Sequence, residues 1–125
     1  MAGVYEIEYK GKMILCLDIA GLQIKDKAEF VKHVNHAKGI VRTQPAKSVL
    51  MITKVSKTGF DSEVAGIIKD YAQHNTPYVK ASAIVGIAGW AKIILTAIKN
   101  LTGREFHLAE TMEDAQEWLV QQVDR

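Results

Sequence analysis

Apolar residues follow two different periods along this chain, and each change of period predicts a change from strand to helix. Residues 4–9 alternate apolar and polar side chains, which is typical of a strand with one face in water. Continuous apolar runs at 13–19, 49–52 and 79–85 predict strands that are buried on both faces. A short last strand is predicted at 105–108.

Four segments between and after these strands space their apolar residues three or four positions apart, as the buried face of a helix does. Asp26 and either Asp61 or Ser62 have the side chains of helix N-caps, whereas Pro45 and Gly103 are typical of the residues that end a helix. The predicted inner faces comprise Phe30, Val31, Val34, Ala37 and Val41 in the first helix, Val64, Ile67, Ile68 and Tyr71 in the second, Trp90, Ile93, Ile94, Ala97, Ile98 and Leu101 in the third, and Ala115, Trp118, Leu119 and Val123 in the fourth.

The predicted order is two strands and a helix, followed by three further strand–helix pairs. Lys10, Gly11 and Lys12 predict a hairpin turn, so the first strand pairs antiparallel with the second at an edge of the sheet. A helix separates each later pair of strands, which favours parallel pairing through right-handed crossovers. The fold class is therefore α/β: a mixed sheet with only the first strand antiparallel, four helices and a right-handed β/α superhelix. Residues 1–125 form a single domain, because no linker, repeat or low-complexity segment interrupts this order.

Three C-terminal segments carry a resemblance to a known fold family. Their sequences are KASAIVG at 80–86, WAK at 90–92 and AQEWL at 115–119. Together with the order of elements, they resemble the SpoIIAA-like fold, the superfamily of STAS domains and anti-sigma-factor antagonists. The closer likeness is to its STAS/SEC14-like branch of small bacterial proteins. The resemblance covers nearly the whole chain and implies a non-enzymatic protein-interaction or regulatory module.

Regulatory STAS proteins carry a hydrophobic-Asp-Ser-Ser-Gly motif after the third strand, and the resemblance places residues 60–64 there. Asp61 and Ser62 match that motif, whereas Glu63 stands at the position of the family's phosphorylated serine and Val64 replaces its glycine. A glutamate in a first helical turn also compensates the helix dipole. The loop after the third strand is the candidate switch or partner-contact loop, with candidate residues Lys54, Ser56, Lys57, Thr58, Asp61 and Ser62.

The charge balance gives no reason to expect a nucleic-acid partner. The chain of 125 residues has 16 basic and 14 acidic side chains and a net charge of +2, without the basic stripe of nucleic-acid-binding proteins.

The single cysteine, Cys16, lies in an apolar run and is expected to be a small buried hydrophobe, which suits a reducing compartment. Lys92 and two glycines interrupt the apolar stretch at 81–98, so we expect no membrane span. The absence of a secretory signal at the N-terminus favours a cytoplasmic location.

Candidate catalytic and metal-binding chemistry is sparse. His33 and His36 lie three residues apart with Glu29 nearby, but a metal site needs three or four ligands, so both histidines are expected at the surface. The glycines at 86–89 lack the spacing of a dinucleotide or phosphate loop and are explained by tight packing. Asp18 follows a buried strand and is expected to cap the loop after it. We therefore expect no cofactor, no metal and no enzymatic activity.

The predicted helix at 90–101 has an apolar arc wider than one core contact requires, because Ala91 and Leu95 lie beside the predicted stripe. Two hypotheses follow from this arc. In the first, the protein is an interaction module that dimerises through this helix. In the second, it is a small carrier with an apolar or lipid-like ligand beside the helix, and an enzyme ranks third. The candidate dimer or ligand face comprises Trp90, Ala91, Ile94, Leu95 and Ile98.

Overall fold

The computed structural model describes residues 2–123 of the chain, apart from the side chain of Trp90. Strands and helices alternate along it after an initial hairpin, as the apolar periods predict. The elements are β1 (Gly3–Tyr9), β2 (Lys12–Asp18), the 3₁₀ turn η1 (Ile24–Asp26), α1 (Lys27–Val41), β3 (Val49–Lys54), α2 (Ser62–Asn75), β4 (Val79–Val85), the 3₁₀ turn η2 (Gly89–Ala91), α3 (Lys92–Thr102), β5 (His107–Ala109) and α4 (Met112–Val123).

The five strands lie side by side in chain order, β1-β2-β3-β4-β5. Only β1 is antiparallel to its neighbour, and the other three pairs are parallel, so the predicted mixed sheet is confirmed. The β1–β2 turn consists of Lys10 and Gly11, with φ angles of 49° and 78°. Two successive left-handed residues are typical of the tight turn whose twist matches that of a hairpin.

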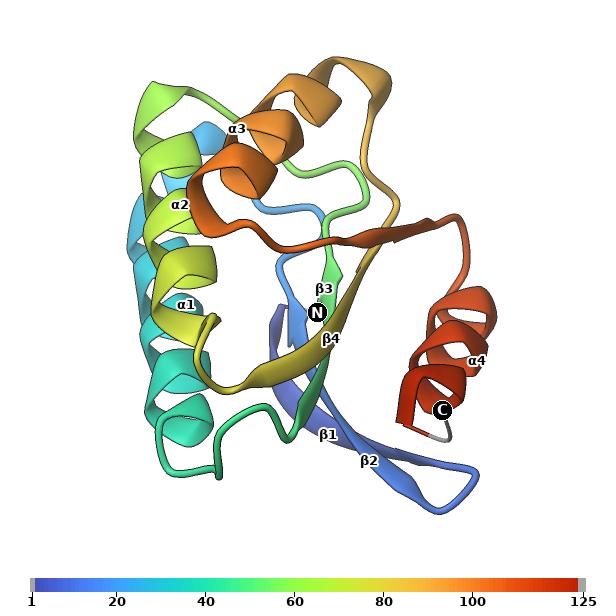
Figure 1. Cartoon of the computed structure of the whole chain (residues 1–125). Helices are drawn as coiled ribbons and strands as arrows, with labels where there is room; N and C mark the ends of the chain where they lie inside the picture. The colour runs from blue at the N-terminus through green and yellow to red at the C-terminus, as the bar shows by residue number, and fades with distance from the viewer. Residues whose placement is uncertain (1, 124–125) are drawn as a thin grey trace.

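The helices cover the two faces of the sheet unequally. Helices α1, α2 and α3 lie on one face and α4 lies alone on the other (Figure 1). The apolar run in β2 serves both faces, since Leu15 and Leu17 join the core beneath α1 and α2, while Ile14 and Cys16 join the core beneath α4. Side chains alternate across a strand, so a strand buried on both sides needs such a continuous run.

Helix α4 is fixed to the hairpin as well as to the sheet. The hydroxyl of Tyr9 donates to Glu117 Oε1 over 2.7 Å, and Lys10 forms an ion pair with the same carboxylate. The hydrogen bond from Lys10, followed by that from Tyr9, lowers the pKa of Glu117. The ring of His107 in β5 stacks on Trp118 with ring centroids 4.8 Å apart. These contacts hold α4 in place on the face of the sheet that no other helix covers.

Some local predictions are wrong in detail. Asp26 immediately precedes α1, but its carboxylate accepts the N–H of Gln23 over 2.8 Å and closes the η1 turn instead of capping the helix. Helix α1 ends at Val41, before Pro45, where the hydroxyl of Thr43 donates to the carbonyl of Ile40. Val31 is 41% exposed and does not belong to the inner face. Strand β5 begins two residues later than predicted, at His107.

The largest correction concerns which side of α3 faces inward. Ile93 and Leu101, predicted to lie on the core stripe, are 77% and 51% exposed. Leu95, predicted to lie outside the core contact, is only 6% exposed, and Ala91 is buried. The helix is rotated relative to the prediction because it packs on α2 rather than directly on the sheet, as Figure 1 shows. Among the described residues, no helix is long and apolar enough to cross a membrane.

Candidate functional site

A cavity of about 50 Å³ lies between α2, α3 and the face of the sheet that they cover. Two helices line it with the same spacing of residues: positions 68, 71, 72 and 75 in α2 and positions 91, 94, 95 and 98 at the start of and along α3. A spacing of three, four and seven places side chains on one helical face, so each helix presents a stripe to the cavity. The lining residues are Met51, Thr53, Val55, Phe60, Ile68, Tyr71, Ala72, Asn75, Ser82, Ile84, Ile87, Ala91, Ile94, Leu95, Ile98, Arg104 and Phe106.

The structure brings four of the five residues of the candidate dimer or ligand face to this cavity. These are Ala91, Ile94, Leu95 and Ile98, while the side chain of Trp90 lies outside the described residues. Among the residues described, the buried side chains of Ala91, Leu95 and Ile98 join neither of the two core clusters of the sheet. They line the cavity together with residues of α2 and of the sheet.

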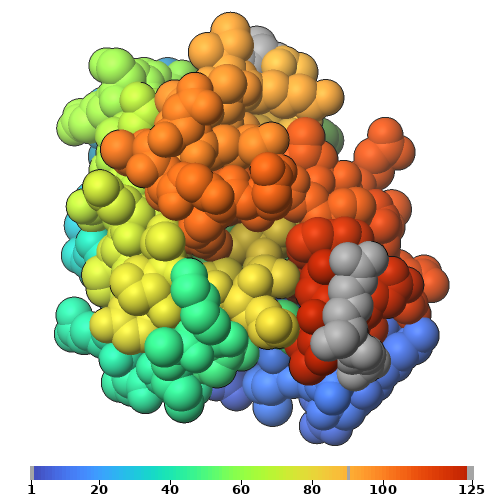
Figure 2. All heavy atoms as spheres, viewed as in Figure 1, coloured from blue at the N-terminus to red at the C-terminus, as the bar shows by residue number. Residues whose placement is uncertain are grey.

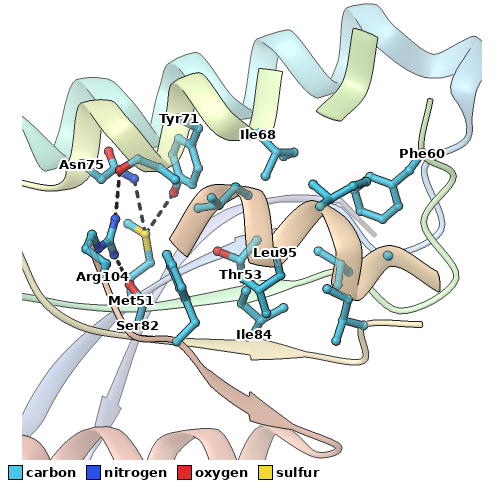
Figure 3. Close-up of a pocket in the computed structure, with 17 residues that line it drawn as sticks. Met51, Thr53, Phe60, Ile68, Tyr71, Asn75, Ser82, Ile84, Leu95 and Arg104 are labelled. Carbon is cyan, nitrogen blue, oxygen red and sulfur yellow. Dashed lines mark hydrogen bonds between the residues drawn. The ribbon is translucent and has the colours of Figure 1, made fainter. Parts of the chain in front are cut away.

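One end of the cavity is polar and the rest is apolar. Figure 3 shows Tyr71, Asn75, Ser82 and Arg104 together at one end and Phe60 at the other, with Ile68, Ile84 and Leu95 among the residues between them. The hydroxyl of Tyr71 donates to the sulfur of Met51 over 3.2 Å, and the side-chain amide of Asn75 donates to the same sulfur over 3.5 Å. Tyr71 and Asn75 are 3% and 1% exposed, and a thioether is a weak acceptor for such buried donors.

Arg104 completes the polar end. Its Nη1 donates to the carbonyl of Ala72 over 2.9 Å, its Nη2 donates to the hydroxyl of Ser82, and its Cζ lies 4.9 Å from the ring centroid of Phe106. No carboxylate within residues 2–123 forms an ion pair with this guanidinium. Burial without a counter-ion lowers the pKa of Arg104 to about 10, partly offset by Tyr71. Burial also raises the pKa of Tyr71, so the hydroxyl stays a donor.

The cavity continues into surface hollows at both ends. Phe60 and Ile94 also line a shallow hollow outside the cavity, together with the exposed Ile93. At the polar end, Ser82 and Arg104 also line an open groove of about 450 Å³ between β4 and α4. In Figure 2 the surface is hollowed between the orange α3 segment and the red α4, with yellow β4 at its floor.

The chain matches no protein-family model and no curated protein. It is similar to a solved structure from Shewanella loihica PV-4, an uncharacterised protein from the DUF3478 family with a SpoIIAA-like fold. The two chains superpose with a TM-score of 0.67 over 95% of each, at 16% sequence identity. This chain has the SpoIIAA-like fold. The fold implied by the sequence resemblance is therefore confirmed.

In this SpoIIAA-like domain the candidate switch loop is fastened to the rest of the molecule. The hydroxyl of Thr58 is buried and donates to the carbonyl of Ile19 over 2.8 Å, and the carbonyl of Lys57 accepts from the side chain of Gln23 over 3.0 Å. Ser56 lies against Gly86, while Lys54 is the last residue of β3. Thr58 is thus a structural residue, and the loop is held at three points.

Asp61 is the N-cap of α2, one of the two alternatives left open by the sequence. Its Oδ1 accepts the N–H of Val64 over 2.8 Å, and its Oδ2 lies 2.9 Å from Nζ of Lys27, which also pairs with Glu63 at 3.0 Å. The Val64 hydrogen bond, followed by the one from Lys27, lowers the pKa of Asp61. Ser62 is the exposed first residue of the helix.

Asp61→Ala is expected to destabilise the domain in a pH-dependent way, whereas Ser62→Ala leaves stability within about 0.5 kcal/mol of wild type. A carboxylate with a lowered folded-state pKa stabilises the fold above its unfolded pKa, and this contribution is lost as pH falls through the folded value. Urea unfolding of both variants from neutral to acid pH measures it. A difference between Asp61→Ala and wild type that persists unchanged at acid pH contradicts the assigned cap.

The remaining candidates have structural surroundings. His33 Nε2 lies 3.1 Å from Glu29 Oε2 and His36 is exposed, and no group of three or more potential metal ligands occurs within residues 2–123. Asp18 ends β2, where its carboxylate accepts the N–H of Ala20 over 3.0 Å as a local cap. Cys16 is fully buried, and burial raises its pKa to about 11.

The residues that the sequence left unnoticed are those of the polar end. Arg104 follows the helix-ending Gly103, and nothing around it in the chain distinguishes it from an exposed arginine. The sequence places Tyr71 on the predicted inner face of the second helix and gives no reason to single out Asn75. The one available signal was the recurrence of polar residues at 71 and 75 on an otherwise apolar helical face.

Proposed function

We propose that this protein is a non-enzymatic carrier that binds a small apolar ligand in the cavity between α2 and α3. The observation that supports this function is the pair of matching stripes on α2 and α3, which leave an apolar cavity between the two helices and the sheet although the helices pack on each other. Protein interiors are normally packed to the density of organic crystals. A cavity of 50 Å³ costs about 1 kcal/mol on the usual scale for apolar voids, and a ligand that fills it removes this cost.

The size of the cavity indicates what binding requires. An engineered void of about 150 Å³ holds benzene, so a cavity of about 50 Å³ accepts only a short chain without rearrangement. We expect α3 to be the wall that moves, because its buried residues join neither core cluster among those described. Larger ligands are expected to displace α3 outward.

The interaction module, which the sequence alone ranks first, is the second candidate here, and it is supported by the apolar surface that Ile93 and Leu101 expose on the outer side of α3. The homodimer, its protein partner and the absence of catalysis stay predictions. A dimer through this surface and a ligand in the cavity are compatible, since they use opposite sides of the same helix. A switch loop that changes conformation is less favoured, because Thr58 and Lys57 hold it to neighbouring segments.

Filling the cavity tests the carrier function. Ala72→Leu adds bulk from α2 and keeps the backbone carbonyl that Arg104 binds, while Ala91→Leu adds bulk from the α3 side. Calorimetric titration with hexan-1-ol is expected to give a saturable heat with wild type and at least about tenfold weaker binding with either variant. Ala28→Leu, at an exposed position of α1, is the matched control and should bind like wild type. Saturable binding that is unchanged in both filled variants would assign the ligand elsewhere.

A further inference from the structure

We propose that the ligand of this cavity is a carboxylate with an unbranched apolar chain, its head held by Arg104, Tyr71 and Asn75 and its chain directed toward Phe60. This inference rests on the proposed function and specifies the chemical class of the ligand. It follows from the polar end of the cavity, where the guanidinium of Arg104 and the buried donors of Tyr71 and Asn75 lie together, while the oxygens of Ser82 and Asn75 already lie within hydrogen-bond distance of Arg104 Nη2 and His74 Nδ1.

The donors at this end exceed the good acceptors. A guanidinium has five N–H donors, and the contacts to Ala72 and Ser82 account for two of its groups. The hydroxyl of Tyr71 and the amide of Asn75 share the sulfur of Met51. A carboxylate offers two oxygens with about four acceptor sites, matches the planar fork of an arginine and supplies the missing negative charge.

A cation is costly to bury unless it is paired. A fully buried charge costs several kcal/mol without an acidic partner, and Arg104, which is half-buried, bears part of that cost. Arg104 has neutral partners and the face of Phe106, and no carboxylate pairs with it anywhere in the described chain from 2 to 123. Its lowered pKa has the same cause. The ligand's head group is the counter-ion that this arrangement lacks.

The surroundings favour an anion over a cation at this end. Lys47 and Lys80 line the groove outside Arg104, with Glu105 as its only acidic lining residue among those described. Three positive side chains against one negative side chain give a local field that attracts anions. The walls beyond, toward Phe60, are apolar and suit an alkyl chain rather than a second charged group (Figure 3).

Arg104 also has a structural role, because the carbonyl of Ala72 lies in the last turn of α2 and needs a partner. Thr76 Oγ1 donates to the same carbonyl over 2.9 Å, so this cap does not depend on Arg104 alone. A purely structural arginine would change stability when replaced and leave the choice of ligand unchanged. Ligand preference is therefore the property that separates the two roles.

The test compares hexanoate, hexan-1-ol and hexylammonium in calorimetric titrations of wild type, Arg104→Gln, Arg104→Lys and Arg42→Gln. Hydrogen bonds to charged groups favour hexanoate over hexan-1-ol by about tenfold or more in wild type. The Arg104→Gln variant should bind hexanoate and hexan-1-ol with similar affinity, and Arg104→Lys should keep part of the preference for hexanoate. Arg42 is exposed at the end of α1, so Arg42→Gln should keep the whole preference. Lengthening the carboxylate from butanoate to hexanoate should strengthen binding by about fourfold per methylene.

The outcomes distinguish failure of the carboxylate proposal from failure of the carrier function. Equal binding of hexanoate and hexan-1-ol by wild type overturns the carboxylate and leaves the carrier function standing. A preference for hexylammonium, or a hexanoate preference that survives in a folded Arg104→Gln, also overturns it. Binding of none of the probes refutes the carrier function and the carboxylate together. The comparison of ligands in wild type decides the question even if Arg104→Gln does not fold.

Discussion

Leu95→Glu is expected to unfold the domain or to lower its free energy of unfolding by about 3 kcal/mol or more. Leu95 is 6% exposed, and its side chain lines the cavity between α2 and α3. Truncating a buried leucine alone costs about 2–5 kcal/mol, and a glutamate adds a carboxylate with no partner in an apolar site. A domain of this size is stable by about 5–15 kcal/mol, so the loss is a large share of the total.

Urea unfolding followed by circular dichroism measures this effect, and Ile93→Glu is its matched control. Ile93 lies on the same helix two residues away and is 77% exposed, so its replacement should change stability by less than about 0.5 kcal/mol. Equal stability of the two variants would mean that α3 faces the other way. Sedimentation of Ile93→Glu beside wild type also tests the predicted dimer, which should weaken if the exposed side of α3 forms the contact.

Gly86→Ala is expected to lower the free energy of unfolding by about 2–4 kcal/mol. Gly86 has a φ angle of 82°, which costs a residue with a side chain about 1–2 kcal/mol. A Cβ atom here would lie 2.1 Å from Oγ of Ser56 and 3.0 Å from its Cβ, so the loop after β3 must move. The close approach of these two loops explains the glycine better than the helix–strand packing expected from the sequence.

Gly103→Ala distinguishes the cost of the backbone conformation from the cost of the steric contact with Ser56. Gly103 ends α3 with a φ angle of 69°, but a Cβ added there meets no atom within 4 Å. Its replacement should therefore cost only the backbone term of about 1–2 kcal/mol. Ser56→Gly should restore part of the stability that Gly86→Ala loses and should do nothing for Gly103→Ala. Equal losses at the two glycines, measured by urea unfolding, would exclude the steric contact.

The order of elements and the sheet could be predicted because local patterns determine them. The alternation at 4–9 against the continuous apolar runs at 49–52 and 79–85 distinguishes an edge strand from central strands. The hairpin at Lys10 and Gly11 and the cap at Asp61 are equally local, since each depends on residues close in the chain. These features do not depend on tertiary contacts between distant segments.

The inward side of α3 could not be chosen in the same way. The helix has apolar residues at 93, 94, 95, 97, 98 and 101, so two overlapping stripes fit a helical period equally well. Periodicity places residues on a common face but does not say which of two apolar faces meets the core. The packing of α3 on α2 decides it, and this contact joins elements separated by a whole strand.

The polar end of the cavity was even harder to predict from the sequence than the orientation of α3. Met51, Tyr71, Ser82 and Arg104 come from β3, α2, β4 and the segment after α3, and each has an ordinary structural explanation in its own segment. Only the folded arrangement shows that a half-buried cation and two buried donors meet at one end of an apolar space. The sequence therefore predicted the apolar residues of α3 that line the cavity, but not the polar side chains at its end.

The measurement that tests the carrier function most directly is a titration of isoleucine-methyl-labelled protein with hexan-1-ol, followed by NMR. Ile68, Ile84, Ile94 and Ile98 line the cavity, whereas Ile14 and Ile52 lie on the opposite face of the sheet beneath α4 and serve as an internal control. We predict saturable shifts of the methyl groups of these four residues and of Ile87, which also lines the cavity, with those of Ile14 and Ile52 unchanged. Unchanged cavity methyl groups, or shifts spread equally over both faces, would contradict a binding site between α2 and α3.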